Sequence, residues 1–276
     1  MGKESVREYV LGTHDAELER LALQHRLWRG VAIQCWDRSC IGTGAAVLDL
    51  GCGPGFATLD LASRVGPQGE VIALDESERF INHLNRCSLQ GGFQNITARV
   101  ADIQSPNLLS ESVDVAYARW VLCFVPDPDA VVQEVTKALR PGGRFAVQDY
   151  VNYEAMLLSP PSEQFTRVVR VVAESWRRRG GDPNICQRIP STMVHCGLTV
   201  ERMRPIVRSA RPDSPLWLWP ESFFRNFLPL LVEQGLLTLE EQRAYDRLWA
   251  ERTADPAAFF CSPPMMEIIA RKPGAG

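Results

Sequence analysis

The fold of this chain is decided by one stretch of ten residues, Val47-Leu48-Asp49-Leu50-Gly51-Cys52-Gly53-Pro54-Gly55-Phe56. Its first four residues form a short apolar run that is typical of a buried parallel strand. Three glycines at alternate positions follow, and apolar residues then recur three apart, which predicts a helix over residues 56–65. A strand, a glycine turn and a helix bring the backbone close to a nucleotide-like ligand, because a Cβ atom at the glycine positions would block that approach.

The spacing of these glycines differs from that of two common nucleotide-binding turns. A dinucleotide fingerprint has the pattern Gly-x-Gly-x-x-Gly, whereas Gly51, Gly53 and Gly55 place the third glycine one residue early. The turn does not end in Gly-Lys-Ser or Gly-Lys-Thr, so it is not a phosphate-binding P-loop.

With an acidic residue leading into it, the string Asp49-Leu50-Gly51-Cys52-Gly53-Pro54-Gly55 resembles motif I of the class I S-adenosylmethionine (SAM) dependent methyltransferases. The resemblance implies that SAM is the cofactor. It also implies the residues of the turn that bind SAM, namely Asp49, Gly51, Cys52, Gly53 and Gly55. The likeness continues almost without a break over residues 47–150, and the Leu-x-Pro-Gly-Gly turn at 139–143 also fits this family.

A second acidic residue, Asp75, stands at the carboxyl end of a predicted strand over residues 71–74. It comes about twenty residues after the glycine turn, where an acid is placed to accept hydrogen bonds from both ribose hydroxyls of an adenosine. This double contact explains why the position holds a carboxylate. The neighbouring Glu76 could share the contact.

Two further segments resemble the family pattern for the adenine and methionine parts of SAM. Ala101-Asp102-Ile103 resembles motif III, which implies that Asp102 binds the adenine amino group and that the Ile103 backbone meets the ring. A loop N-cap is the alternative role for Asp102. In the family, the residue after the fourth strand contacts the methionine part through its backbone, and here that residue is Arg119.

The order of the predicted elements indicates the fold class. Strands are expected at residues 47–50, 71–74, 96–100, 113–118, 145–148, 198–207 and 266–271, with helical patterns between the early ones. The resemblance implies an α/β fold with a doubly wound, Rossmann-like sheet of seven strands. In this fold the last strand is antiparallel and lies beside the fifth.

The residues before the first strand predict a helical lid. A helix is expected to start near Asp15 and to end at Gly30, before a second helix over residues 31–40. The inward face of the first helix is expected to carry Leu18, Leu21, Ala22, His25 and Trp28.

Within this segment, Tyr9-x-x-Gly12 followed by Glu19-Arg20-Leu21-x-x-Gln24 resembles the N-terminal lid of small-molecule methyltransferases. That resemblance implies that Tyr9 and Gln24 touch the methionine end of SAM. A packed tyrosine and a surface glutamine are the alternatives.

The chain therefore divides into a lid, a core and a cap. We expect the lid at residues 1–44 and the SAM-binding core at 45–150. The substrate cap is expected at 151–187 and 208–264, with the end of the core sheet at 188–207 and 265–276. The second cap segment is rich in large aromatic rings, which can bury one another, line an apolar substrate pocket, or dock on a membrane or a second subunit.

Methyl transfer from a sulfonium ion is an in-line displacement of an activated group, so the protein mainly supplies orientation and exclusion of water. The sequence therefore need not show a catalytic triad or a metal site, and no metal is expected. A base would help an acceptor that must lose a proton. The candidates are His14, Asp149, Tyr150 and His195, with His14 and Tyr150 preferred, while His25 and His83 are interpreted as structural or surface residues.

Composition narrows the class of partner. The net charge of −3 argues against a dominant nucleic-acid or membrane partner. The eight cysteines show no Cys-x-x-Cys pair or zinc spacing, and Met1 to Val10 lacks the apolar run of a signal peptide. We therefore expect a cytoplasmic protein whose partner is a small-molecule substrate. A homodimer is left open.

The sequence thus predicts a SAM-dependent methyltransferase acting on a small organic acceptor, an apolar or aromatic biosynthetic intermediate, with O-methylation first and N- or C-methylation next. Arsenite methylation is not expected, because the cysteines lack the spaced trio that this chemistry uses. Two alternatives stay open: a SAM-binding partner or regulatory protein without catalysis, and a nucleotide-sugar or NAD-dependent oxidoreductase on a similar fold. An RNA or protein methyltransferase is disfavoured.

Overall fold

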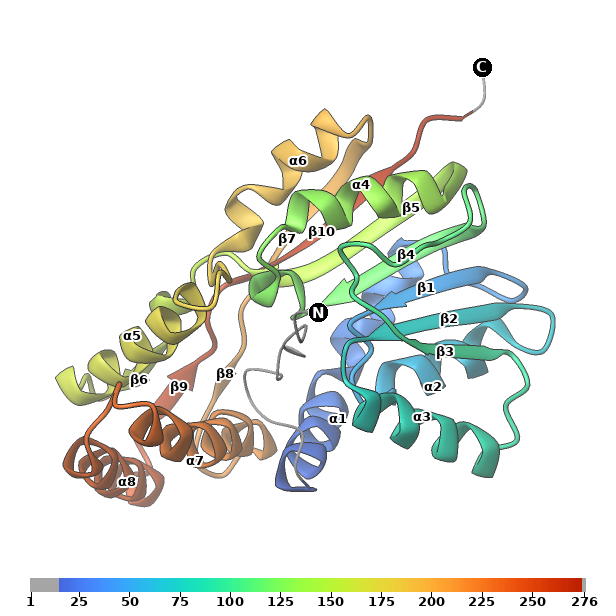
Figure 1. Ribbon diagram of the computed structural model, residues 1–276. Helices are drawn as coiled ribbons and strands as arrows, with labels where there is room; N and C mark the ends of the chain where they lie inside the picture. Colours follow the sequence, from blue (N-terminus) through green and yellow to red (C-terminus); the bar gives the residue numbers. More distant parts are fainter. Residues whose placement is uncertain (1–14, 275–276) are drawn as a thin grey trace, which may run out of the picture.

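The computed structural model describes residues 15–274 and contains a seven-stranded sheet with the strand order β3-β2-β1-β4-β5-β10-β7 (Figure 1). The strands are β1 Ala46–Leu50, β2 Glu70–Asp75, β3 Ile96–Val100, β4 Val113–Arg119, β5 Leu139–Tyr150, β7 Thr199–Ile206 and β10 Met265–Arg271. Strands from β3 to β5 pair in parallel, whereas β10 pairs antiparallel with both β5 and β7. The predicted doubly wound sheet, with its last strand antiparallel beside the fifth, is confirmed.

Helices cover both faces of this sheet, with α4 and α6 on one face and α2 and α3 on the other (Figure 1). The helices are α1 Asp15–Arg38, α2 Phe56–Val65, α3 Glu78–Gln90, α4 Pro128–Ala138, α5 Glu163–Arg177, α6 Ile189–His195, α7 Leu218–Glu233 and α8 Leu239–Ala254. Side chains alternate along β1, so Val47 packs in the core beneath α1 and α2 while Leu48 and Leu50 pack in the opposite core.

The strand order reverses between β1 and β4. In open α/β sheets, ligands bind in the crevice outside the carboxyl ends of the strands at such a reversal. β1 ends at Leu50, directly before the glycine turn, and β4 ends at Arg119, so both segments reach the same edge of the sheet.

The predicted break at Gly30 is wrong, because α1 runs without interruption from Asp15 to Arg38. A glycine in a helix interior lowers the stability of the helix by only about 1 kcal/mol relative to alanine. The turns on either side of Gly30 bury Trp28, Ala32 and Trp36. Because burial of one large apolar side chain contributes about 1.5–3 kcal/mol, packing outweighs the glycine.

The buried face of α1 also differs from the predicted one. His25 and Trp28 are buried as expected, but in the first turns the buried residues are Glu17 and Arg20. Arg20 donates to both carboxylate oxygens of Glu17, at 2.7 Å from Nε and 2.6 Å from Nη2. Apolar periodicity could not predict this face, since charged residues are buried only when they are paired.

The segments after β5 form a cap from α5, α7, α8 and a small sheet with the order β6-β9-β8. Its strands are β6 Leu157–Ser159, β8 Ser209–Ala210 and β9 Phe259–Cys261. The sequence did not predict this small sheet, because strands of two or three residues show no periodicity. Aromatic rings do bury one another: the Trp217 and Trp249 rings lie 4.7 Å apart, and the Phe224 and Tyr245 rings 5.1 Å apart.

Candidate functional site

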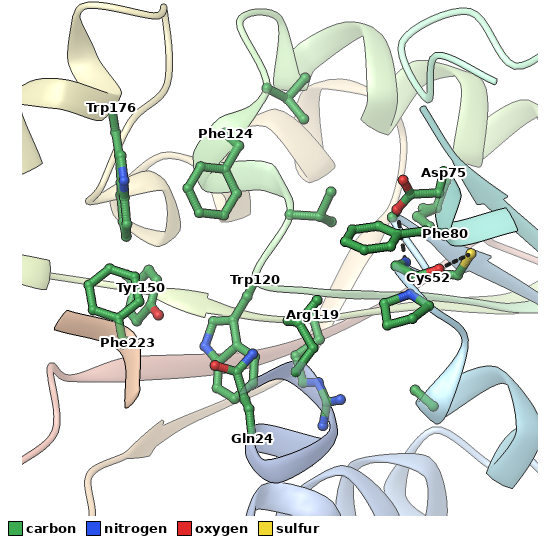
Figure 2. A pocket seen from close by; sticks show the side chains of 18 of the residues that line it. Gln24, Cys52, Asp75, Phe80, Arg119, Trp120, Phe124, Tyr150, Trp176 and Phe223 are labelled. Atoms are coloured by element: carbon green, nitrogen blue, oxygen red, sulfur yellow. Dashed lines mark hydrogen bonds between the residues drawn. The ribbon is translucent and has the colours of Figure 1, made fainter. Parts of the chain in front are cut away.

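A cavity of about 570 Å³ lies at the carboxyl ends of β1 and β4, with walls that include residues of α1, α5 and α7. Figure 2 shows its two ends: Cys52, Asp75 and Phe80 at the glycine-turn end, Tyr150, Trp176 and Phe223 at the aromatic end, and Gln24, Arg119 and Trp120 between them. The volume falls in the usual range of small-molecule sites, roughly 300–1,000 Å³.

The glycine turn leaves bare backbone facing this cavity. Gly51 and Gly53 have positive φ angles of 61° and 56°, which L residues rarely adopt. A Cβ at Gly51 would lie 2.3 Å from Cγ2 of Val121, so the chain needs glycine there for packing. A Cβ at Gly53 would meet nothing within 4 Å, and Gly53 lines the cavity, so glycine there keeps space for a ligand.

Asp75 braces the turn from the end of β2. Its Oδ2 accepts from the Gly53 N–H at 2.8 Å, and its Oδ1 accepts from the Ser77 N–H at 2.9 Å. Burial raises the pKa of Asp75 above its ordinary value, although both backbone hydrogen bonds oppose this shift. A carboxylate has about four lone-pair sites, so each oxygen keeps one for a hydroxyl group of a ligand.

The other acidic residues at this end are exposed or partnered. Glu76 is exposed and lines the cavity beside Asp75. Asp102 is exposed and accepts from the Gln104 backbone N–H at 2.9 Å and from its side-chain amide at 2.9 and 3.0 Å. Ile103 is buried and lines the cavity beside it. Asp102 therefore has two features at once. It stabilises a local turn through its hydrogen bonds with Gln104, and it lies on the cavity wall.

Asp49 is buried in β1 beneath the turn. Its Oδ2 accepts from the Thr58 hydroxyl at 2.7 Å. Burial raises the pKa of Asp49 to about 6, even though the Thr58 hydrogen bond and the charge of Arg119 favour the carboxylate. Cys52 follows closely in the turn, and burial raises the pKa of its thiol, so the thiol is uncharged at neutral pH.

Arg119 lies between the two ends of the cavity and contacts His25 of α1, which in turn contacts Asp60 of α2. Its Nη2 lies 3.1 Å from Nδ1 of His25, and Nε2 of His25 lies 3.0 Å from Oδ2 of Asp60. The guanidinium carbon lies 5.0 Å from the centre of the Trp120 ring. Nη1 of Arg119 is buried and has no hydrogen-bond acceptor among the described residues.

The aromatic end is built by β5, the cap and the segment after β4. Its rings belong to Trp120, Phe124, Tyr150, Tyr153, Trp176, Trp219, Phe223, Phe224 and Phe260. Tyr150 and Tyr153 pack edge to face with ring centres 5.1 Å apart. Burial raises the pKa of Tyr150 well above its ordinary value, so its hydroxyl stays protonated at neutral pH and can donate a hydrogen bond.

Gln24 joins the two halves of the cavity wall. Its Oε1 accepts from Nη1 of Arg20 at 2.9 Å and from the indole N–H of Trp219 at 2.8 Å. The Trp219 hydrogen bond links α7 to α1, and the Arg20 hydrogen bond restrains the same Gln24 oxygen from within α1.

The structure brings most of the predicted site residues to this one cavity: Gln24, Asp49, Gly51, Cys52, Gly53, Asp75, Glu76, Asp102, Ile103, Arg119 and Tyr150. Gly55 is not among its lining residues and packs instead against Leu84. Tyr9 and His14 lie outside the described residues. The ligand contacts of all these residues stay predictions.

The two weaker candidates for the base lie elsewhere. Asp149 is buried and accepts from the backbone N–H groups of Cys123 and Tyr150, and it does not line the cavity. His195 is on α6, and its Nδ1 lies 2.7 Å from the Ser191 carbonyl oxygen.

Sequence reasoning missed several residues of the cavity wall. His25 was interpreted as structural or surface, but it lines the cavity and contacts Arg119. Arg20 lies four residues before Gln24, and this helical spacing was a usable signal that both share a face. The sequence carried no signal for Trp176, because its place at the aromatic end depends on how α5 packs on the core.

A family model described as a methyltransferase domain matches residues 41–189, more than half of the chain. The chain is similar to the arsenite methyltransferase of Halobacterium salinarum, with 33% identity over 113 residues, or 41% of this chain and 29% of that protein. It is also similar to the nocamycin O-methyltransferase of Saccharothrix syringae, with 32% identity over 120 residues, or 44% of this chain and 43% of that protein.

Among solved structures, the fold resembles the geranyl diphosphate C-methyltransferase of Streptomyces coelicolor, in complex with geranyl diphosphate and S-adenosylhomocysteine. The TM-score is 0.58 at 15% identity, covering 93% of this chain and 82% of that one, so this likeness concerns the fold alone. The chain spans less than half the length of the curated relatives named above.

Within residues 15–274, no helix combines the length and the hydropathy that a membrane span requires. Within the same part of the chain, no group of three His, Cys, Asp or Glu side chains is arranged so that it could hold a metal ion.

Proposed function

Because the chain belongs to the class I SAM-dependent methyltransferases, with SAM as their cofactor, we propose that it methylates a small organic acceptor with an apolar or aromatic surface. One observation carries the proposal. A single cavity joins the glycine turn and Asp75 to a wall of aromatic rings. A cofactor at one end and an acceptor at the other would therefore meet without crossing solvent.

Two features of the glycine-turn end and one of the middle of the cavity fit SAM. Gly53 leaves space where a Cβ atom would project, and Asp75 keeps lone pairs for two hydroxyl groups. Nη1 of Arg119 is a buried donor that lacks an acceptor, and the carboxylate of the methionine part would supply one. We propose that Asp75 holds the ribose, Asp102 and Ile103 the adenine, and Arg119 and Gln24 the methionine end.

The aromatic end supports an acceptor with a large apolar face. Aromatic rings bury ligand surface efficiently and stack on flat ligands. We propose that residues 151–187 and 208–264 act as the substrate cap, since α5 contributes Trp176 and α7 contributes Trp219 and Phe223 to this wall. An arsenite acceptor is not favoured, because Cys52 is the one cysteine lining the cavity within residues 15–274.

When bound, SAM supplies an electrophilic methyl group. The chain's own residues orient the acceptor and exclude water. The protonated Tyr150 hydroxyl would donate a hydrogen bond to an acceptor oxygen that binds already deprotonated, as a phenolate, enolate or carboxylate, and would leave a lone pair of that oxygen free for the methyl group. This favours O-methylation, with N- or C-methylation as the alternative. A base role for His14 stays a prediction.

The direct test is turnover. We expect the protein to form S-adenosylhomocysteine from SAM with members of a panel of phenols, enols and aromatic carboxylic acids. Tyr150→Phe should lower kcat for oxygen acceptors by about tenfold, as loss of one hydrogen bond predicts. Binding of SAM without product from any acceptor would support the non-catalytic alternative instead.

A further inference from the structure

A chain of four side chains runs from the protein surface to the cavity. Arg29 on α1 donates to both oxygens of Asp60 on α2, at 2.6 and 3.0 Å. Asp60 lies 3.0 Å from Nε2 of His25, and Nδ1 of His25 lies 3.1 Å from Nη2 of Arg119 at the end of β4. Three elements therefore meet at one buried imidazole ring.

The chemistry of these partners fixes the protonation state of His25. A guanidinium group only donates hydrogen bonds, so Nδ1 must accept from Arg119 and cannot carry a proton. The single proton of the neutral ring is therefore on Nε2, which donates to Asp60. Burial lowers the pKa of His25, and the nearby charges of Arg119 and Arg29 lower it further, against the opposing effect of Asp60.

The same contacts restrain the Arg119 guanidinium. His25 holds Nη2, and the face of Trp120 lies 5.0 Å from the guanidinium carbon. Nη1 is left buried and without an acceptor among the described residues. An unpaired buried donor on a cation is costly, so this group is prepared to receive an anionic ligand atom.

We propose that His25 is a positioning residue that holds Arg119 for the carboxylate of the cofactor's amino-acid group. This inference rests on the proposed function, in which Arg119 faces the methionine part of SAM. Protonation of His25 would place an N–H against the Arg119 cation and remove the acceptor. Cofactor affinity should therefore fall as the pH drops below the ordinary range of histidine.

Affinities for two ligands distinguish a positioning role of His25 from a role in packing alone. S-adenosylhomocysteine carries the amino-acid group, whereas 5′-methylthioadenosine has the same adenosine and thioether without it. By calorimetry on the full chain, His25→Leu should weaken binding of S-adenosylhomocysteine about tenfold and change binding of methylthioadenosine less than about twofold. Arg119→Ala should show the same selective loss.

His25→Gln tests the hydrogen bonds themselves, since an amide oxygen can accept from Arg119 and an amide N–H can donate to Asp60. We expect it to restore most of the affinity for S-adenosylhomocysteine and to abolish the fall in affinity at low pH. His83→Gln is the matched control, because His83 is also a helical histidine with a lowered pKa but does not line the cavity. It should keep the wild-type affinities and the pH dependence.

The outcomes are distinct. Unchanged affinity in a folded His25→Leu protein, or an equal loss for both ligands, would overturn the positioning role and leave the proposed function standing. A folded wild-type protein that binds neither ligand would overturn the proposed function, and the positioning role with it.

Discussion

The indole N–H of Trp219 in α7 donates a 2.8 Å hydrogen bond to Oε1 of Gln24 in α1, which joins segments 195 residues apart. Both side chains line the cavity. The bond therefore links the cap to the helix that borders the proposed cofactor end, and it gives a way to loosen the cap without removing an aromatic ring.

We expect Trp219→Phe to raise KM for the acceptor about fivefold, because one neutral hydrogen bond contributes about 1 kcal/mol. Affinity for SAM should change less than KM for the acceptor, since the phenyl ring keeps an aromatic side chain in the acceptor wall, and the loss of ring size is matched in the control below. Steady-state kinetics with each substrate varied would show this. Trp217→Phe is the control, because Trp217 donates to Thr253 within the cap and does not line the cavity. A similar KM change in both variants would argue against a specific role for the Gln24 bond.

Gly53→Ala should abolish most SAM binding. The new Cβ would project into the cavity, and its strain in the left-handed region adds about 1–2 kcal/mol. Gly44→Ala is a matched control, because Gly44 has a φ of 83° and also has nothing within 4 Å of a built Cβ, but it does not line the cavity. Calorimetry and thermal unfolding should show similar destabilisation in both variants, with loss of affinity in Gly53→Ala alone. Equal affinities would contradict the ligand role of the turn.

We expect the ion pair between Arg38 and Glu267 to contribute more to the free energy of unfolding than an exposed ion pair does. Arg38 donates to both oxygens of Glu267, at 2.6 and 2.7 Å, and Glu267 is fully buried in β10. Arg38→Leu should lower the free energy of unfolding by about 3–5 kcal/mol, because it leaves a buried carboxylate unpaired. Arg140→Leu, which breaks the exposed pair with Asp114, should cost less than about 1 kcal/mol. Urea unfolding measures both, and equal losses would contradict the account.

Asp149 should make the stability of the fold depend on pH. Burial raises its pKa to about 6, whereas an unfolded chain has about 3.9. Stabilisation from this group is therefore complete below about pH 4 and is lost as the pH rises through about 6. Asp149→Asn should flatten the fall in unfolding free energy between about pH 4 and 6. Part of the fall should remain in this variant, because the pKa of Asp49 is also raised to about 6. An unchanged slope in urea unfolding would contradict this.

Sequence patterns predicted the strands well, because their signals are local, whereas the arrangement of the strands in the sheet was implied by the resemblance to the methyltransferase family. The apolar run at 47–50, the glycine turn and the strand ends at Asp75 and Arg119 follow from short-range periodicity and backbone chemistry. The break at Gly30 was wrong because packing of Trp28 and Trp36 outweighs local propensity.

The aromatic end and the His25 contacts could not be predicted in the same way. Asp60 reaches His25 from α2, Arg119 reaches it from β4, and Trp176 reaches the cavity from α5. Such neighbours depend on how distant segments pack. The Glu17–Arg20 pair shows the same limit. Two charged residues three apart are typical of a solvent-exposed helix face, and only the structure shows that this pair is buried.

The central claim is that this cavity binds SAM with Asp75 on the ribose. The most direct measurement is calorimetric titration of wild-type protein and Asp75→Ala with SAM, with NAD as a control ligand and thermal unfolding to verify the fold. We predict binding by the wild type at about 1–100 μM, a loss of at least about tenfold in Asp75→Ala, and no binding of NAD. No SAM binding by the folded wild type, or equal affinity in the variant, would contradict the account, and binding of NAD would favour an oxidoreductase.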